Sequence, residues 1–112
     1  MTAALDKAIN EKKPIIVTGW TPHWMFAKYD LKFLDDAKGT FGDAEEIRVI
    51  TRKDFDKDMP EVNEFLSKFS MTDEELSDLM GAVEEGSSPL EAATEWMNKN
   101  EDVVNKWMPS DK

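Results

Sequence analysis

The sequence contains no cysteine and only one histidine, and both shortages limit the chemistry that it can carry. Without cysteine there can be no disulfide, no thiolate metal site and no thiol nucleophile. The single histidine, His23, excludes metal sites built from several histidines, because no H-x-x-x-H spacing can occur. We therefore predict no metal site.

Motifs that signal catalysis or phosphate binding are also missing. The sequence has no G-x-S-x-G nucleophile elbow, and neither G-x-G-x-x-G nor a P-loop pattern occurs. Its Gly-Ser pair, Gly86-Ser87, falls in a turn between two predicted helices. Acidic pairs such as Asp35-Asp36 lie in a predicted loop, where exposure is the usual state of aspartate. We predict a protein that is not an enzyme and that needs no cofactor.

Basic residues and long apolar runs are scarce. The chain has 14 Lys and Arg against 24 Asp and Glu, which gives a net charge of -10. Nucleic acids and anionic lipids attract basic surfaces, so we expect neither as a partner. No stretch approaches the ~20 apolar residues of a membrane span. A polar helical pattern follows Met1 directly, so we expect neither a signal peptide nor an anchor. With 112 residues, 40% of them apolar, the chain is long enough for one small domain.

The first half of the chain, residues 14–52, has the apolar pattern of a small sheet. After a helix over residues 2–12, the predicted strands are residues 15–17, 30–34 and 47–51. The continuous run Ile15-Ile16-Val17 is typical of a strand buried on both faces. Two or three strands make a poor sheet alone, so we expect the missing strands to lie on another chain or in a part that is absent.

The second half, residues 60–108, is predicted to be helical. Apolar residues recur there with helical spacing. Two capping boxes, Thr72 to Glu75 and Ser88 to Glu91, mark the starts of two helices. The order of elements predicts an α/β fold, in which a few-stranded sheet precedes a helical C-terminal half.

An aromatic turn follows the first predicted strand. The sequence Gly19-Trp20-Thr21-Pro22-His23-Trp24 holds two of the four tryptophans and the only histidine. Thr21 as N-cap and Pro22 as the first helical residue predict a short helix that reaches Tyr29. Ligands of open α/β sheets bind beyond the carboxyl ends of strands, which is where this turn lies.

Two interpretations of the aromatic turn are open from the residues alone. The first is ordinary packing of Trp20, His23 and Trp24 in the core. The second is a ligand cage, because tryptophan offers the strongest π-face for a cation and histidine can donate a hydrogen bond to a carboxylate. Such a cage suits a ligand with a quaternary ammonium at one end and a carboxylate at the other.

The aromatic turn and its continuation through residue 34 resemble glycine betaine binding proteins, the extracytoplasmic substrate-binding subunits of osmoprotectant ABC transporters. The stretch reads G-W-T-P-H-W-M-F and continues into K-Y-D-L-K-F-L. The later segments E-A-A with W-M, and V-V-N-K-W, also resemble the C-terminus of that family. The resemblance covers residues 1–112 and only the C-terminal portion of a complete member, which is more than twice as long.

The resemblance implies a partial lobe of the type II periplasmic-binding-protein fold. It implies three ligand-binding residues: Trp20 as one wall of an aromatic box, His23 as the carboxylate donor, and Trp24 packing beneath. Which tryptophan faces the cleft is left open. The implied partners are glycine betaine or a related zwitterion and, in the full-length context, an ABC permease, with an extracytoplasmic location.

An alternative interpretation makes the chain a stand-alone acidic α/β protein-interaction module with the tryptophan cluster as its core. Amphipathic, well-capped helices and acidic charge fit that interpretation equally well. Under the fragment interpretation, a half-fold leaves apolar surface uncovered, so we also expect self-association into a homo-oligomer.

Overall fold

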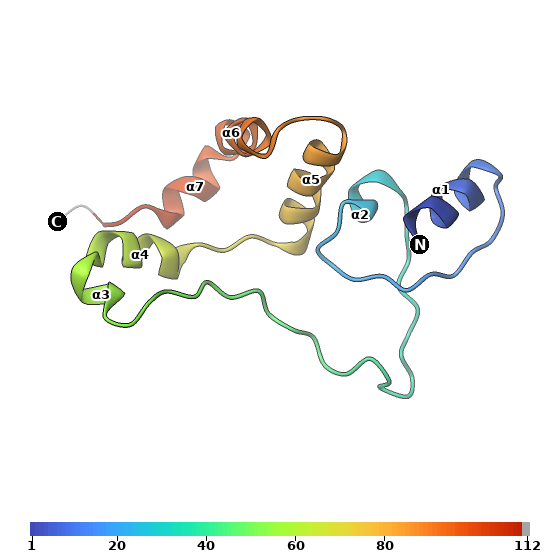
Figure 1. Ribbon diagram of the computed structural model, residues 1–112, viewed down its shortest axis with the longest axis horizontal. Helices are drawn as coiled ribbons and strands as arrows, with labels where there is room; N and C mark the ends of the chain where they lie inside the picture. The colour runs from blue at the N-terminus through green and yellow to red at the C-terminus, as the bar shows by residue number, and fades with distance from the viewer. Residues whose placement is uncertain (111–112) are drawn as a thin grey trace. The chain divides into compact units, whose positions relative to one another are not determined.

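The computed structural model describes residues 1–110 and divides into two compact units. Unit 1 comprises Met1–Leu31 and Met71–Ala92, and unit 2 comprises Lys32–Ser70 and the chain from Ala93 onward. The described residues form seven helices (Figure 1): α1 (Thr2–Asn10), α2 (Met25–Lys28), α3 (Phe55–Asp58), α4 (Pro60–Lys68), α5 (Asp73–Glu84), α6 (Pro89–Lys99) and α7 (Glu101–Trp107). The last two residues of the predicted domain lie outside the described part.

Unit 1 is built around Leu5 of α1 and Met25 of α2, the largest fully buried side chains, and Ala92 is buried there as well. Helix α2 packs on α5 (Figure 1). The approach is close because α5 carries a glycine there: a Cβ added to Gly81 would lie 3.2 Å from the Cβ of Ala27. Helix α5 is therefore the support on which the short α2 rests.

Both predicted capping boxes are confirmed. At the start of α5, the Glu75 backbone N–H donates to Thr72 Oγ1 at 3.1 Å, and the Thr72 N–H donates to the Glu75 carboxylate at 2.8 Å. At the start of α6, Ser88 and Glu91 exchange equivalent bonds of 3.3 and 3.0 Å. These bonds satisfy backbone donors that a helix start otherwise leaves free.

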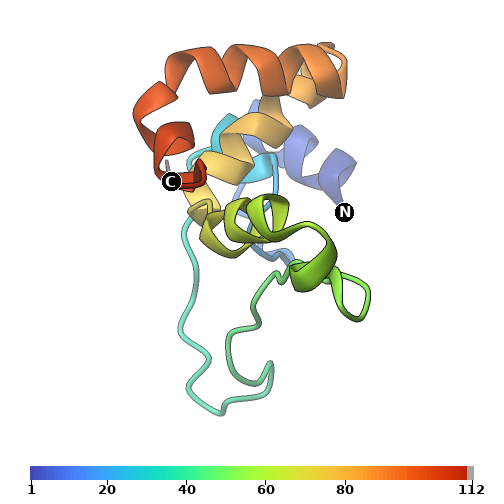
Figure 2. The same ribbon diagram turned by 90° about the vertical axis from the view of Figure 1, so that its left-hand side faces the viewer.

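Unit 2 has an aromatic core at the end of the chain. Trp107 of α7 is buried, and its ring stacks on that of Trp96 with centroids 5.9 Å apart. Phe69, which follows α4, approaches the same ring at 4.7 Å. Figure 2 shows α6, in orange, turning sharply into α7, in red. The tryptophans near the chain end therefore pack against one another, as helical spacing predicts for core residues.

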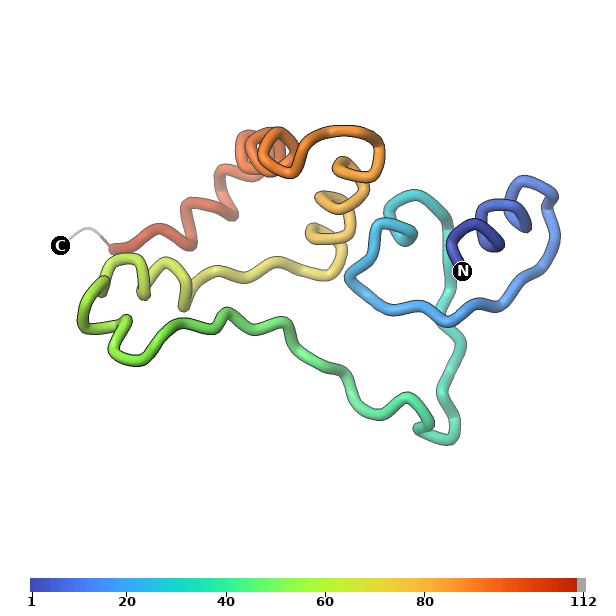
Figure 3. Tube along the Cα trace, in the orientation of Figure 1, coloured from blue at the N-terminus to red at the C-terminus, as the bar shows by residue number. Residues whose placement is uncertain are grey.

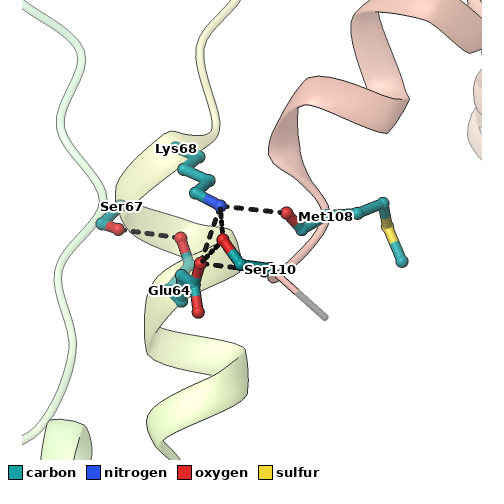
Figure 4. A network of polar contacts seen from close by, with 5 residues as sticks. All are labelled: Glu64, Ser67, Lys68, Met108 and Ser110. Carbon is teal, nitrogen blue, oxygen red and sulfur yellow. Dashed lines mark hydrogen bonds and ion pairs between the residues drawn. The ribbon is translucent and has the colours of Figure 1, made fainter. Parts of the chain in front are cut away.

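A polar network joins the end of α7 to α4 (Figure 4). The Lys68 ammonium donates to Glu64 Oε1 at 2.7 Å and to the Met108 carbonyl at 3.1 Å. The Ser110 hydroxyl and backbone N–H both donate to the same Glu64 oxygen at 3.0 Å. These donors lower the pKa of Glu64 to about 2, with the Lys68 bond as the largest cause.

The few-stranded sheet predicted for residues 14–52 is not formed in the described chain. Residues 15–17, 30–34 and 47–51 run without a helix or strand, and the tube in Figure 3 shows the segment between α2 and α3 as a long connection. Ile16 is 82% exposed and Ile50 is 92% exposed. The residue pattern gives the tendency to form strands, but a strand exists only when its backbone pairs with another.

The predicted helix start at Thr21-Pro22 is also wrong. Thr21 and Pro22 lie in a turn with a cis peptide bond between them, and α2 begins three residues later, at Met25. The predicted short helix itself is present, although it spans four residues and ends at Lys28, one residue before the predicted end.

Candidate functional site

The turn before α2 brings the three predicted site residues together. The rings of Trp20 and His23 meet edge to face, with centroids 5.1 Å apart and an interplanar angle of 85°. The rings of His23 and Trp24 lie 5.2 Å apart and are tilted by 37°. Trp20 is 56% exposed, whereas His23 and Trp24 are half-buried. The turn therefore offers one exposed indole with an imidazole at its side.

A backbone hydrogen bond orients the His23 ring. The Met25 N–H donates to His23 Nδ1 at 3.2 Å. An imidazole nitrogen that accepts a hydrogen bond carries no proton, so the proton of the neutral ring lies on Nε2. His23 is thus prepared to act as a hydrogen-bond donor through Nε2, which is the chemistry that a carboxylate ligand requires.

A second bond holds the backbone of His23, and sequence reasoning missed its partner. The His23 N–H donates at 3.2 Å to Oγ of Ser77, a residue of α5 that is only 3% exposed. One signal could have identified the contact: Ser77 and Gly81 are small residues four positions apart, which marks one helix face as open to close approach. That face carries α2.

The Trp24 ring already has a cation of its own chain beside it. The Lys28 ammonium lies 5.6 Å from the Trp24 centroid and 5.0 Å from that of Tyr29. Lys28 also lies 3.7 Å from a carboxylate oxygen of Asp6, to which the Tyr29 hydroxyl donates a hydrogen bond. The hydrogen bond with Tyr29, aided by Asp6, raises the pKa of Lys28. Trp24 is therefore engaged within unit 1.

Neither of two shallow hollows in unit 1 encloses the pair formed by Trp20 and His23. One lies beside Trp24 and Gly81, and the other, of about 300 Å³, lies between Thr21 and Ser77. Among residues 1–110 no group of three or more acidic or histidine side chains could hold a metal ion. No helix in that range is long and apolar enough to cross a membrane. The candidate site is an open wall.

The family model for the substrate binding domain of the ABC-type glycine betaine transport system matches residues 1–99. The chain belongs to this family. Proteins of this kind bind a substrate and do not catalyse a reaction, which agrees at the family level with the prediction that the chain is not an enzyme. The membership favours the transport interpretation over the stand-alone interaction module.

Two relatives show how much of a family member the chain represents. A glycine betaine/carnitine transport binding protein of Listeria monocytogenes is 50% identical over 107 residues, which are 96% of this chain and 36% of that protein. The crystal structure of lactococcal OpuAC, in its closed-liganded conformation complexed with glycine betaine, matches with a TM-score of 0.77 and 45% identity. The match covers 96% of this chain and 42% of the OpuAC chain. The chain thus spans well under half the length of these relatives.

Proposed function

We propose that this chain supplies one wall of a binding site for glycine betaine or a related quaternary ammonium zwitterion, in the substrate-binding component of an ABC importer. The observation that carries the proposal is the exposed Trp20 ring with the His23 imidazole beside it, the two ring centroids 5.1 Å apart. The relatives named above support the ligand class. Such uptake of compatible solutes serves osmoprotection.

The two residues suit the two ends of the ligand. The trimethylammonium group would lie over the face of Trp20, whose quadrupole attracts a cation that cannot donate hydrogen bonds. The carboxylate would accept a hydrogen bond from His23 Nε2–H, since Nδ1 is already engaged by Met25. Trp24 would act from beneath, because Lys28 lies near its ring.

The wall needs an opposite side, because one cation–π contact contributes only ~0.5–2 kcal/mol. We propose that residues 1–112 form the C-terminal part of a two-lobe protein of the type II periplasmic-binding-protein fold. In it, residues 14–52 are the strand and ligand-turn region, and residues 60–108 are the helical region. The exposed, β-branched residues around Ile16 and Ile50 would become strands once other backbone pairs with them.

The partner of such a protein is an ABC permease, which receives the ligand at the extracytoplasmic face of a membrane. The parent protein would accordingly act in the periplasm or at the cell surface. Without the remaining part of the fold, the exposed apolar segments would favour association between copies of the chain.

A chimera tests the proposal. The 107 matched residues of the Listeria relative are exchanged for those of this chain, and binding of glycine betaine and choline is measured by calorimetry. His23→Ala removes a charge-assisted hydrogen bond to the carboxylate, so we expect glycine betaine to bind about 10-fold to 100-fold more weakly. Choline has no carboxylate and should bind as before. An equal loss for both ligands, or no loss for glycine betaine, would contradict the proposal.

A further inference from the structure

Ser77 is a buried polar residue in the middle of a helix, a position that calls for a specific hydrogen-bond partner. It is 3% exposed, and its Oγ accepts the N–H of His23 across 54 positions of sequence. Serine is no better than average as a helix former, so helix formation does not account for it. Its hydroxyl meets the one segment of unit 1 that carries the candidate ligand donor.

Three hydrogen bonds act on different parts of His23, and one of them, from the Phe26 N–H to the His23 carbonyl at 3.1 Å, is local to the turn. Ser77 holds the backbone N–H, and Met25 holds ring nitrogen Nδ1. Met25 is itself 1% exposed and forms the start of α2, so its N–H has a fixed position. The Ser77 bond is the one that ties the His23 backbone, and with it the ring bonded to Met25, to another helix. The imidazole is therefore linked to α5 through a single serine hydroxyl.

We propose that Ser77 is a positioning residue for His23. It fixes the turn before α2 so that Nδ1 faces Met25 and Nε2–H is the donor available to a ligand. This role deepens the proposed function, because the use of Nε2–H by a ligand rests on that function. The positioning of His23 by Ser77 can be tested in this chain without a ligand. A site built on α5 gains precision because a helix moves less than a turn.

The test uses the full 112-residue chain and two NMR readouts that need no ligand. Ser77→Ala keeps α5 helical, because alanine is the best helix former. We expect hydrogen exchange of the His23 amide to rise about threefold to tenfold, which is the loss of one hydrogen bond. We also expect the 15N shifts of the neutral ring to move from the pure Nε2–H tautomer towards the mixture of free histidine.

Two further variants make the result specific. Ser77→Thr retains the hydroxyl and should restore both signals to those of the unaltered chain. Ser67→Ala removes a serine of α4 whose hydroxyl donates to the Glu64 carbonyl at 2.8 Å, and it should leave His23 unchanged. The proposal is overturned if Ser77→Ala leaves the tautomer and exchange unaltered, or if Ser77→Thr behaves like Ser77→Ala. Since no ligand is involved, these failures are distinct from a failure of the His23→Ala binding test.

Discussion

Replacing Trp20 by alanine in the chimera tests the cation-binding half of the site. Trp20 is 56% exposed in this chain, and the His23 ring stands nearly perpendicular to it with the two centroids 5.1 Å apart, so much of the indole surface is open to a ligand. Binding between two lobes would remove water from that face. A desolvated cation–π contact contributes about 2 kcal/mol, against about 0.5 kcal/mol for an exposed one.

The expected loss follows from these magnitudes. Trp20→Ala should weaken glycine betaine binding about 30-fold if the cation is desolvated, and only about twofold if it remains in water. Trp20→Phe keeps a smaller, weaker π-face and should fall between the unaltered protein and Trp20→Ala. Trp24 is the informative comparison, because its ring lies 5.6 Å from the ammonium of Lys28 and is not free for a second cation. We expect Trp24→Phe to change affinity less than Trp20→Phe.

Calorimetric titration measures these affinities directly. Phe41→Ala is the matched control, since Phe41 is another exposed aromatic residue, at 81%, and lies in a loop of unit 2. Its removal should leave the affinity unaltered. A folded Trp20→Ala variant that binds glycine betaine as tightly as the unaltered chimera would refute the reasoning. A larger loss from Trp24→Phe than from Trp20→Phe would refute it as well.

Two predictions concern stability. In the folded chain the pKa of Glu64 is lowered from its ordinary 4.5 to about 2. The contribution of the ionised Glu64 to the stability of the fold is therefore complete above pH 4.5 and is lost as the pH falls towards 2. Glu64→Gln should flatten the dependence of Tm on pH between these values, and an unchanged slope would contradict the prediction. Trp107→Ala should cost about 3–5 kcal/mol in urea unfolding followed by circular dichroism, because the ring is buried against other aromatics. Met108 is the next residue along the chain and is half-exposed, so Met108→Ala should lower the free energy of unfolding far less. Equal losses from the two variants would show that the burial of Trp107 does not explain its contribution to stability.

The helical half of the fold could be predicted because its signals are local. A capping box such as Thr72 with Glu75 spans three residues and satisfies its own backbone, so no distant partner is needed. Strands differ, because their hydrogen bonds go to another segment. The run at Ile16 has the composition of a buried strand, yet it is exposed, because no pairing backbone is present among the described residues.

The sequence predicts which residues make up the candidate site, but not the contacts that hold them in place. The cluster of Trp20, His23 and Trp24 follows from the spacing of rare residues within one turn. The contact from Ser77 to His23 joins residues 54 positions apart, and the sequence contains no local trace of that pairing beyond the small residues of α5. The helix start expected at Pro22 was wrong because the residue types of an N-cap also occur in turns.

The most direct test of the central claim is an intermolecular NOE measurement on the chimera with methyl-labelled glycine betaine. The account predicts NOEs from the N-methyl protons to the indole ring of Trp20, together with a shift of the His23 Nε2–H resonance on binding. The account would be contradicted by NOEs to other residues of this chain without any to Trp20. It would also be contradicted if the His23 Nε2–H resonance did not shift when the ligand binds.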